Sequence, residues 1–478
     1  MQNYTRYKLN IWTLAGLFAL FCAFICSLNL FRDNYPLYYS ILPSMPFVCS
    51  IMFFISSMCL KNEQNNIAVV LIIATALVRY CVLPIFLVFS NFATAMKLNI
   101  EKNATGAIIL LIYEIIAVFL TVIIVQKKQT TKIINQTNRS GVRFKLLGEI
   151  LAVLLLFCLF VLVYIPQTKL MFKTIFDLTN EDFTSVTYSA SMNELGSTKR
   201  ILQTLFAMVF HFLRIMVPIY VVKLAKTKKA RESVIFLIAF VFVFLQFLLI
   251  TSTFAESIIS GLIILIVTAK ICPEKGSRLL KFSAVFVCAI VIIYFCVRYW
   301  VNTTKLNTSY YTKDGNFFSY LSNIINAYFT GVDNVAAVFN VPQNGKLEAL
   351  FFNVYRAIPF NNSLFGLDGE NFQSIYNSAN NLTGQIQPTI ASGYYFFGPI
   401  FAPILSVLIT WVALTFANKG QKTQYFWEYV AYTFTAISIA LGLSMYNDAI
   451  VLQWFTTWEL PIIILSKLSS EKINDVIR

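Results

Sequence analysis

The chain has 478 residues, of which 58% are hydrophobic and only 12% are charged. A soluble domain is about 45–50% apolar and about 25% charged, so this composition excludes a soluble globule, a disordered chain and a small disulfide scaffold. The formal net charge of +15 would indicate nucleic-acid binding in a soluble protein. Here we expect no nucleic-acid partner, because excess Lys and Arg mark the cytoplasmic loops of membrane proteins.

The first apolar stretch, 10–31, is too long for the core of a cleavable signal peptide and is predicted to span the membrane. A spanning helix needs about 20 apolar residues, and further windows of that kind follow along the chain. The expected fold class is an all-α, polytopic integral membrane protein, with residues 1–478 forming a single transmembrane domain. Its twelve predicted helices are 10–31, 38–60, 67–90, 106–126, 146–166, 201–222, 233–251, 254–271, 282–300, 392–417, 425–446 and 449–466.

Basic residues gather in three loops and indicate the orientation of the chain. The clusters lie at 127–145, 223–231 and 270–281, on the same side of a twelve-span chain as both termini. The positive-inside rule assigns this side to the cytoplasm. The windows 233–251 and 254–271 form either two spans or one re-entrant element. Two spans keep all three basic loops on the same side of the membrane.

Two long loops, 167–200 and 301–391, then face outward. The second is predicted to be a large extracytoplasmic loop carrying short helices, because the segment 317–340 spaces its apolar residues three and four apart. Of the 32 Asn in the chain, 15 lie between Asn302 and Asn381, together with many Tyr and Phe. Amides and aromatic rings bind sugars well, so this loop either binds a glycan or forms a cap packed on the membrane interface.

Few polar residues offer chemistry inside the spans. The single histidine, His211, is either a helix-packing residue or a general base. The charged residues Arg79, Glu114, Arg214 and Glu256 form either internal ion pairs or a wet cavity, and Asp448 lies at an outer edge. No HExxH, DxD, GxGxxG or P-loop pattern occurs, so we expect no metal and no cofactor.

Cations in the outward loops run against the positive-inside trend. They indicate an anionic ligand, and the Asn- and aromatic-rich surface beside them indicates that this ligand has a sugar part. Arginine suits phosphate especially well, because its guanidinium presents a fixed fork of donors. These cations are Lys169, Lys173, Lys199, Arg200, Arg298, Lys305, Lys313, Lys346 and Arg356.

Three stretches carry a resemblance to a known family. They are YFTGVDNVAAVFNV (328–341), GQIQPTIASGYYFFGPIFAPILS (384–406) and STFAESIISGLIILIV (252–267). With the span count and the large outward loop, they resemble the Wzy-type polymerases of bacterial O-antigen and capsular polysaccharide. The third stretch occupies the place of a family turn that carries an Arg, and here Glu256 stands nearby instead.

The resemblance implies a metal-independent glycosyltransferase in the bacterial cytoplasmic (inner) membrane. It would join undecaprenyl-diphosphate-linked oligosaccharide repeat units at the outer face of that membrane, with a chain-length regulator and a flippase as partners besides lipid. The residues expected to act fall into three roles. They are Arg356, Arg298, Arg200, Arg214 and Arg79 for the diphosphate; Asp333, Glu370 and Asp368 for the base; and Asn371, Gln385, Gln387 and Tyr394 for the sugar.

Two other functions share parts of this pattern. A Wzx-type flippase has about twelve spans and the same lipid-linked substrate, but its loops are short and its halves resemble each other. An O-antigen ligase has a similar loop architecture but carries a His in its large outward loop, where this chain has none. A membrane acyltransferase would also need a catalytic His near its acyl donor.

Overall fold

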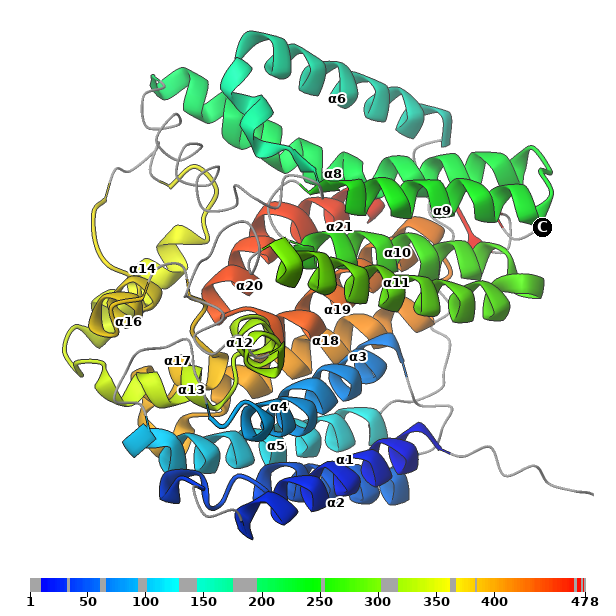
Figure 1. Cartoon of the computed structure of the whole chain (residues 1–478). Helices are drawn as coiled ribbons and strands as arrows, with labels where there is room; N and C mark the ends of the chain where they lie inside the picture. The colour runs from blue at the N-terminus through cyan, green and yellow to red at the C-terminus, as the bar shows by residue number, and fades with distance from the viewer. Residues whose placement is uncertain are drawn as a thin grey trace, which may run out of the picture.

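A computed structural model describes most of the chain and shows a bundle of helices (Figure 1). The secondary structure is almost entirely helical, apart from the two-residue strands β1 (Lys173–Thr174) and β2 (Leu249–Ile250), which pair antiparallel. The described residues are 10–31, 35–60, 66–92, 101–128, 144–174, 196–250, 254–301, 317–361, 367–382, 385–467, 471–473 and 476. Parts of the predicted loops, including Lys305 and Lys313, lie outside them.

The N-terminal helices form one side of the bundle, where α1 and α2 pack closely together and α5 packs against α2 (Figure 1). Their bounds are α1 (Ile11–Leu28), α2 (Ser44–Cys59), α3 (Ile67–Ala76), α4 (Leu83–Phe89) and α5 (Ala104–Lys127). The opposite side holds α6 against α8, followed by α9, α10 and α11. Their bounds are α6 (Phe144–Tyr164), α8 (Ser197–Thr227), α9 (Glu232–Leu248), α10 (Phe254–Ile271) and α11 (Pro273–Val301).

Short helices follow in the predicted outward loop, and the last helices return to the centre of the bundle. The short ones are α12 (Phe317–Phe329), α13 (Val332–Ala336), the 3-10 turn η9 (Ala337–Asn340), α14 (Lys346–Arg356) and α16 (Phe372–Ala379). The segment 317–340 is thus helical except for a break at Thr330 and Gly331, between α12 and α13. The last are α17 (Thr389–Phe401), α18 (Ile404–Lys422), α19 (Phe426–Met445), α20 (Asp448–Trp454) and α21 (Leu460–Lys467).

The helices are consistent with a polytopic membrane protein. Among the described residues, eight helical segments are long and apolar enough to cross a membrane, and the bent pair α17–α18 would make a ninth. Large apolar side chains such as Leu156 and Val163 on α6 face outward, where lipid would cover them. The windows 233–251 and 254–271 form two separate helices, α9 and α10, packed side by side. The count of twelve spans stays a prediction.

Two of the apolar segments contain a π-helical turn just before a proline. The turn η4 (Leu77–Val82) precedes Pro84, and η10 (Phe455–Glu459) precedes Pro461. Proline has no N–H to donate and its ring clashes with the carbonyl four residues back, so the helix widens locally. Each π turn holds one buried charged residue, Arg79 in η4 and Glu459 in η10.

The window 392–417 is not one helix, contrary to the prediction. The axes of α17 and α18 differ by 111°, so the segment turns a corner at residues 398–403. Gly398 has φ 77°, a conformation that favours glycine, and Pro399 and Pro403 each remove a helical N–H. The corner brings the carbonyl of Ala402 directly against Gly393.

Replacing Gly393 by alanine is expected to lower the stability of the bundle by about 1–3 kcal/mol, because the new methyl group would clash with the Ala402 carbonyl oxygen. The control is Gly420→Ala in α18, where a methyl group would meet its nearest atom at an ordinary 3.5 Å. Thermal unfolding of the purified protein in detergent measures both. Equal melting temperatures for the two variants would contradict the close approach at the corner.

Candidate functional site

A polar cavity of about 660 Å³ lies between α14, the segment 367–371, α16 and the start of α20. These elements lie at the end of the bundle opposite the marked C-terminus (Figure 1). One cation, Arg356, and one acid, Asp368, line the cavity beside Phe352 and Tyr355. The other polar side chains are mostly amides: Asn361, Asn371, Gln373, Asn377 and Gln453.

Arg356 is held at the rim of this cavity by the end of α14. The residue lies in the last helical turn, where a cation is favoured by the exposed carbonyls. Its Nη2 donates to the carbonyl of Gly369 at 3.1 Å, which ties the segment 367–371 to α14. A side chain at Gly369 would collide with the ring of Phe352, so only glycine lets the backbone pass this close.

An amide network, here called the floor, adjoins the cavity through Gln373, which belongs to the cavity lining. Asn353 Nδ2 donates to Asp448 Oδ2 at 3.2 Å, and Asn353 Oδ1 accepts from the N–H of Phe372 at 3.1 Å. Asn447 Nδ2 donates to Gln373 Oε1 at 2.7 Å and to Gln387 Oε1 at 2.9 Å. The floor therefore joins α14, α16, α20 and the residues just before α17.

Asn353→Ala is expected to lower the stability by about 2–4 kcal/mol, because it removes two hydrogen bonds and leaves the Asp448 carboxylate without its amide donor. The matched control is Asn344→Ala, at an exposed position just before the same helix. Thermal unfolding compares the two variants. A variant of Asn353 as stable as the control would show that the floor does not depend on this side chain.

The structure brings three of the predicted site residues together, because Arg356, Asp368 and Asn371 all line the cavity. Glu370 is exposed on the same segment. The Asn371 side chain also caps α16, since its Oδ1 accepts from the N–H and the hydroxyl of Ser374. Gln387 is fully buried in the floor, and the Gln385 carbonyl accepts from Gln373 Nε2 at 3.4 Å.

The other predicted residues lie elsewhere. Tyr394 packs on Phe339 with the ring centroids 5.0 Å apart. Arg200 is exposed at the start of α8, and Arg298 belongs to α11, with its side chain outside the described part of the structure. Arg79, Arg214 and Asp333 are buried in two other polar clusters.

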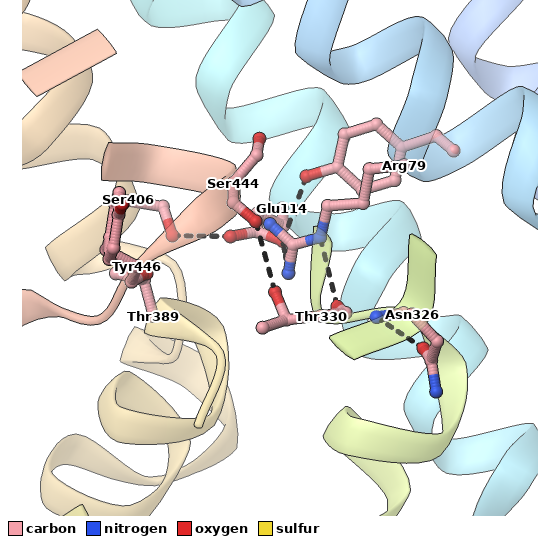
Figure 2. Close-up of polar contacts among 10 residues, drawn as sticks. Arg79, Glu114, Asn326, Thr330, Thr389, Ser406, Ser444 and Tyr446 are labelled. Atoms are coloured by element: carbon pink, nitrogen blue, oxygen red, sulfur yellow. Dashed lines mark hydrogen bonds and ion pairs between the residues drawn. The ribbon is translucent and has the colours of Figure 1, made fainter. Parts of the chain in front are cut away.

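Arg79 lies in a buried cluster where the segment 317–340 meets the long apolar helices (Figure 2). Its Nη2 is 3.1 Å from Glu114 Oε2, and both side chains are completely buried. The Glu114 carboxylate also accepts from the Tyr80 hydroxyl at 2.9 Å and from the Ser406 hydroxyl at 2.6 Å. These contacts tie η4 to α5 and α18.

The same arginine holds the turn between α12 and α13. Arg79 Nε donates to the carbonyl of Thr330 at 3.2 Å (Figure 2). Thr330 has φ 45°, an unfavourable conformation for a β-branched residue, and Asn326 Oδ1 accepts from the next N–H, that of Gly331. Arg79 therefore anchors the turn between α12 and α13 to the bundle.

Asp333 lies beyond this turn and is also buried. Its Oδ1 accepts from the Tyr39 hydroxyl at 3.0 Å. Burial, with a smaller effect of Asp333, raises the pKa of Tyr376 above its usual value, so this phenol stays a donor and bonds the Asn334 carbonyl at 2.7 Å. These contacts fix α13 rather than place Asp333 in the cavity.

Arg214 belongs to the second cluster, inside the helices α8, α9 and α10. Pro218 lacks the N–H that would bond the Arg214 carbonyl, and Gln246 Nε2 donates to that carbonyl at 3.2 Å. The guanidinium bonds Gln246 Oε1 and, at 2.7 Å, the Ser257 hydroxyl. Glu256 Oε2 lies 3.8 Å from both Arg214 and His211.

His211 stacks on Trp458 at 4.1 Å, so it joins α8 to η10. The contacts described here for His211 and Arg214 join helices of the bundle, and neither residue lines the cavity between α14 and α20. In the described structure, each internal cluster joins helices of the bundle.

Sequence reasoning missed the floor residues Asn353 and Asn447. The signal for Asn447 was the pair Asn-Asp directly after an apolar span, which is a typical start of a helix. Asn353 could have been found from its position three residues before Arg356, on the same face of a helix.

The described residues contain no group of three or more His, Cys, Asp or Glu side chains that could hold a metal ion. The described lining of the cavity thus presents amides, one guanidinium and one carboxylate to a ligand. No family model matches the chain, and neither a curated protein nor a solved structure is similar to it.

Proposed function

We propose that the protein polymerises surface polysaccharide in a bacterial cytoplasmic membrane, by joining oligosaccharide repeat units carried on undecaprenyl diphosphate. The observation that carries this proposal is the amide-lined cavity holding Arg356, at one end of a bundle whose long helices are apolar. Amide groups suit the many hydroxyls of a glycan, because each can donate and accept. The bundle suits a substrate with a lipid tail.

The reaction is glycosyl transfer. A hydroxyl at the non-reducing end of one lipid-linked repeat unit attacks the anomeric carbon of the growing glycan. The bond from that carbon to the diphosphate breaks, and the diphosphate leaves with the electron pair. Arg356 neutralises the charge that develops there, and a carboxylate takes the hydroxyl proton. Of the three predicted bases, Asp368 lines the cavity.

The orientation completes the proposal. With twelve spans and three basic loops in the cytoplasm, both termini are cytoplasmic and the cavity opens to the outer face. Alkaline phosphatase fused after residue 340, near the end of η9, should be active, because this enzyme matures only outside the cytoplasm. A fusion after residue 128 in a basic loop serves as the inactive control. If only the fusion after residue 128 is active, the true topology is the inverse of the proposed one.

Deleting the gene and separating the surface glycan on a gel tests the proposed function. Loss of a polymerase leaves a single repeat unit on its final acceptor. Loss of a flippase leaves no surface glycan and accumulates lipid-linked units inside the cell, whereas loss of a ligase accumulates lipid-linked polymer. A ladder of normal length in the deletion strain would exclude all three functions.

A further inference from the structure

The floor of the cavity and Ser392 beside it contain a set of buried polar atoms without a standard hydrogen-bond partner among the described residues. Gln387 Nε2, Ser392 Oγ and Asp448 Oδ1 are all buried and make no hydrogen bond of standard geometry among the described residues, although the Ser392 hydroxyl approaches the Asp448 carboxylate. Buried polar groups are nearly always paired, so such a set indicates a site that a ligand or water completes.

The set is directly connected to the cavity. Asn447 joins Gln387 to Gln373, which lines the cavity. Asp448 follows Asn447 in the chain and precedes Ala449 and Ile450, which also belong to the lining. The Gln373–Asn447 hydrogen bond joins the cavity lining to this set, and a sugar hydroxyl can replace either partner of it.

The chemistry of the set matches a hydroxyl group. Gln387 Nε2 is a donor, Asp448 Oδ1 is an acceptor, and Ser392 Oγ can act as both. A sugar hydroxyl accepts one hydrogen bond and donates another, so it can pair with a donor such as Gln387 Nε2 or with an acceptor such as Asp448 Oδ1. A phosphate would not fit, because it would meet the Asp448 carboxylate as a second anion.

We propose that this set binds the acceptor hydroxyl and that Asp448 is the base which takes its proton. The inference rests on the proposed polymerase function. Asp448 Oδ1 accepts the proton as the hydroxyl oxygen forms its bond to the anomeric carbon, and the diphosphate leaves with the electron pair of the broken bond.

The surroundings of Asp448 favour this role over the exposed Asp368. Asn353 Nδ2 holds the Oδ2 atom at 3.2 Å, so the carboxylate is oriented with its other oxygen towards the set. Asp448 is also the first residue of α20, in the first helical turn, where an acidic side chain is favoured. Asp368 has neither feature and is exposed to solvent.

The test uses the purified full chain in lipid nanodiscs, with lipid-linked repeat units extracted from a strain that lacks the gene. Asp448→Ala should lower the rate of chain lengthening at least 100-fold, a typical effect of losing a general base. Added formate should restore part of that rate, because it can occupy the space of the missing carboxylate. The control Glu348→Ala, at an exposed acid on α14, should leave the rate unchanged.

Each other result overturns the inference in a distinct way. A normal rate for Asp448→Ala excludes Asp448 as the base. A low rate that formate does not restore, together with a lower melting temperature, assigns Asp448 to structure alone. A wild-type chain that fails to lengthen the glycan overturns the proposed function itself, and this outcome is seen before any variant is compared.

Discussion

Replacing Arg79 by methionine is expected to lower the stability of the protein by about 3–5 kcal/mol, because it leaves the Glu114 carboxylate buried without its cation. Glu114 lies on α5, and its partners come from η4 and α18. The loss of the guanidinium also frees the Thr330 carbonyl, so the turn at the start of α13 loses its anchor.

A double-mutant cycle separates the ion pair from simple packing. Glu114→Gln alone should also be strongly destabilising, because it leaves the Arg79 charge buried. The double variant Arg79→Met, Glu114→Gln should be more stable than either single variant, since it buries no charge and its amide still bonds a hydroxyl of the cluster. Thermal unfolding in detergent measures the cycle, with the exposed Arg231→Met as the control. Strictly additive losses would show that the pair is not coupled.

The apolar spans are the part of the fold that the sequence predicts best. The windows 10–31, 38–60 and 106–126 coincide with helical segments of the structure, because only a long apolar helix satisfies its own backbone in lipid. The corner at Gly398 was missed because the apolar run continues through it. Its prolines were visible in the sequence, but the direction of the turn depends on the packing of Ala402 against Gly393.

The candidate site was only partly predictable, for a related reason. Charge and amide content in the segment 301–391 indicated Arg356, Asp368 and Asn371, which lie close together in the chain and line one cavity. The floor depends on pairs that are far apart, such as Asn353 with Asp448, 95 residues later. One sequence shows no pattern for such pairs. The sequence likewise showed that Arg79 and Glu114 are two charged residues in apolar spans, but it did not show that their side chains form an ion pair.

Arg356→Ala is expected to lower the rate of chain lengthening by about 10²–10³, because no other guanidinium among the described residues lines the cavity to neutralise the departing diphosphate. In cells, the ladder of surface glycan should collapse towards a single repeat unit. Arg356→Lys should recover only part of the rate, because an ammonium keeps the charge but loses the fixed fork of donors.

The geometry of Arg356 makes this comparison informative. Its Nη2 bond to the Gly369 carbonyl is exposed, so losing it should change stability by less than about 1 kcal/mol, and the loss of rate is then a loss of chemistry. Lys102→Ala is the matched control, an exposed cation beside α13 at the same end of the bundle but absent from the cavity lining. If Arg356→Ala and Lys102→Ala both give ladders of normal length, the diphosphate is bound away from this cavity, and the role of its amides in glycan binding must be tested without Arg356.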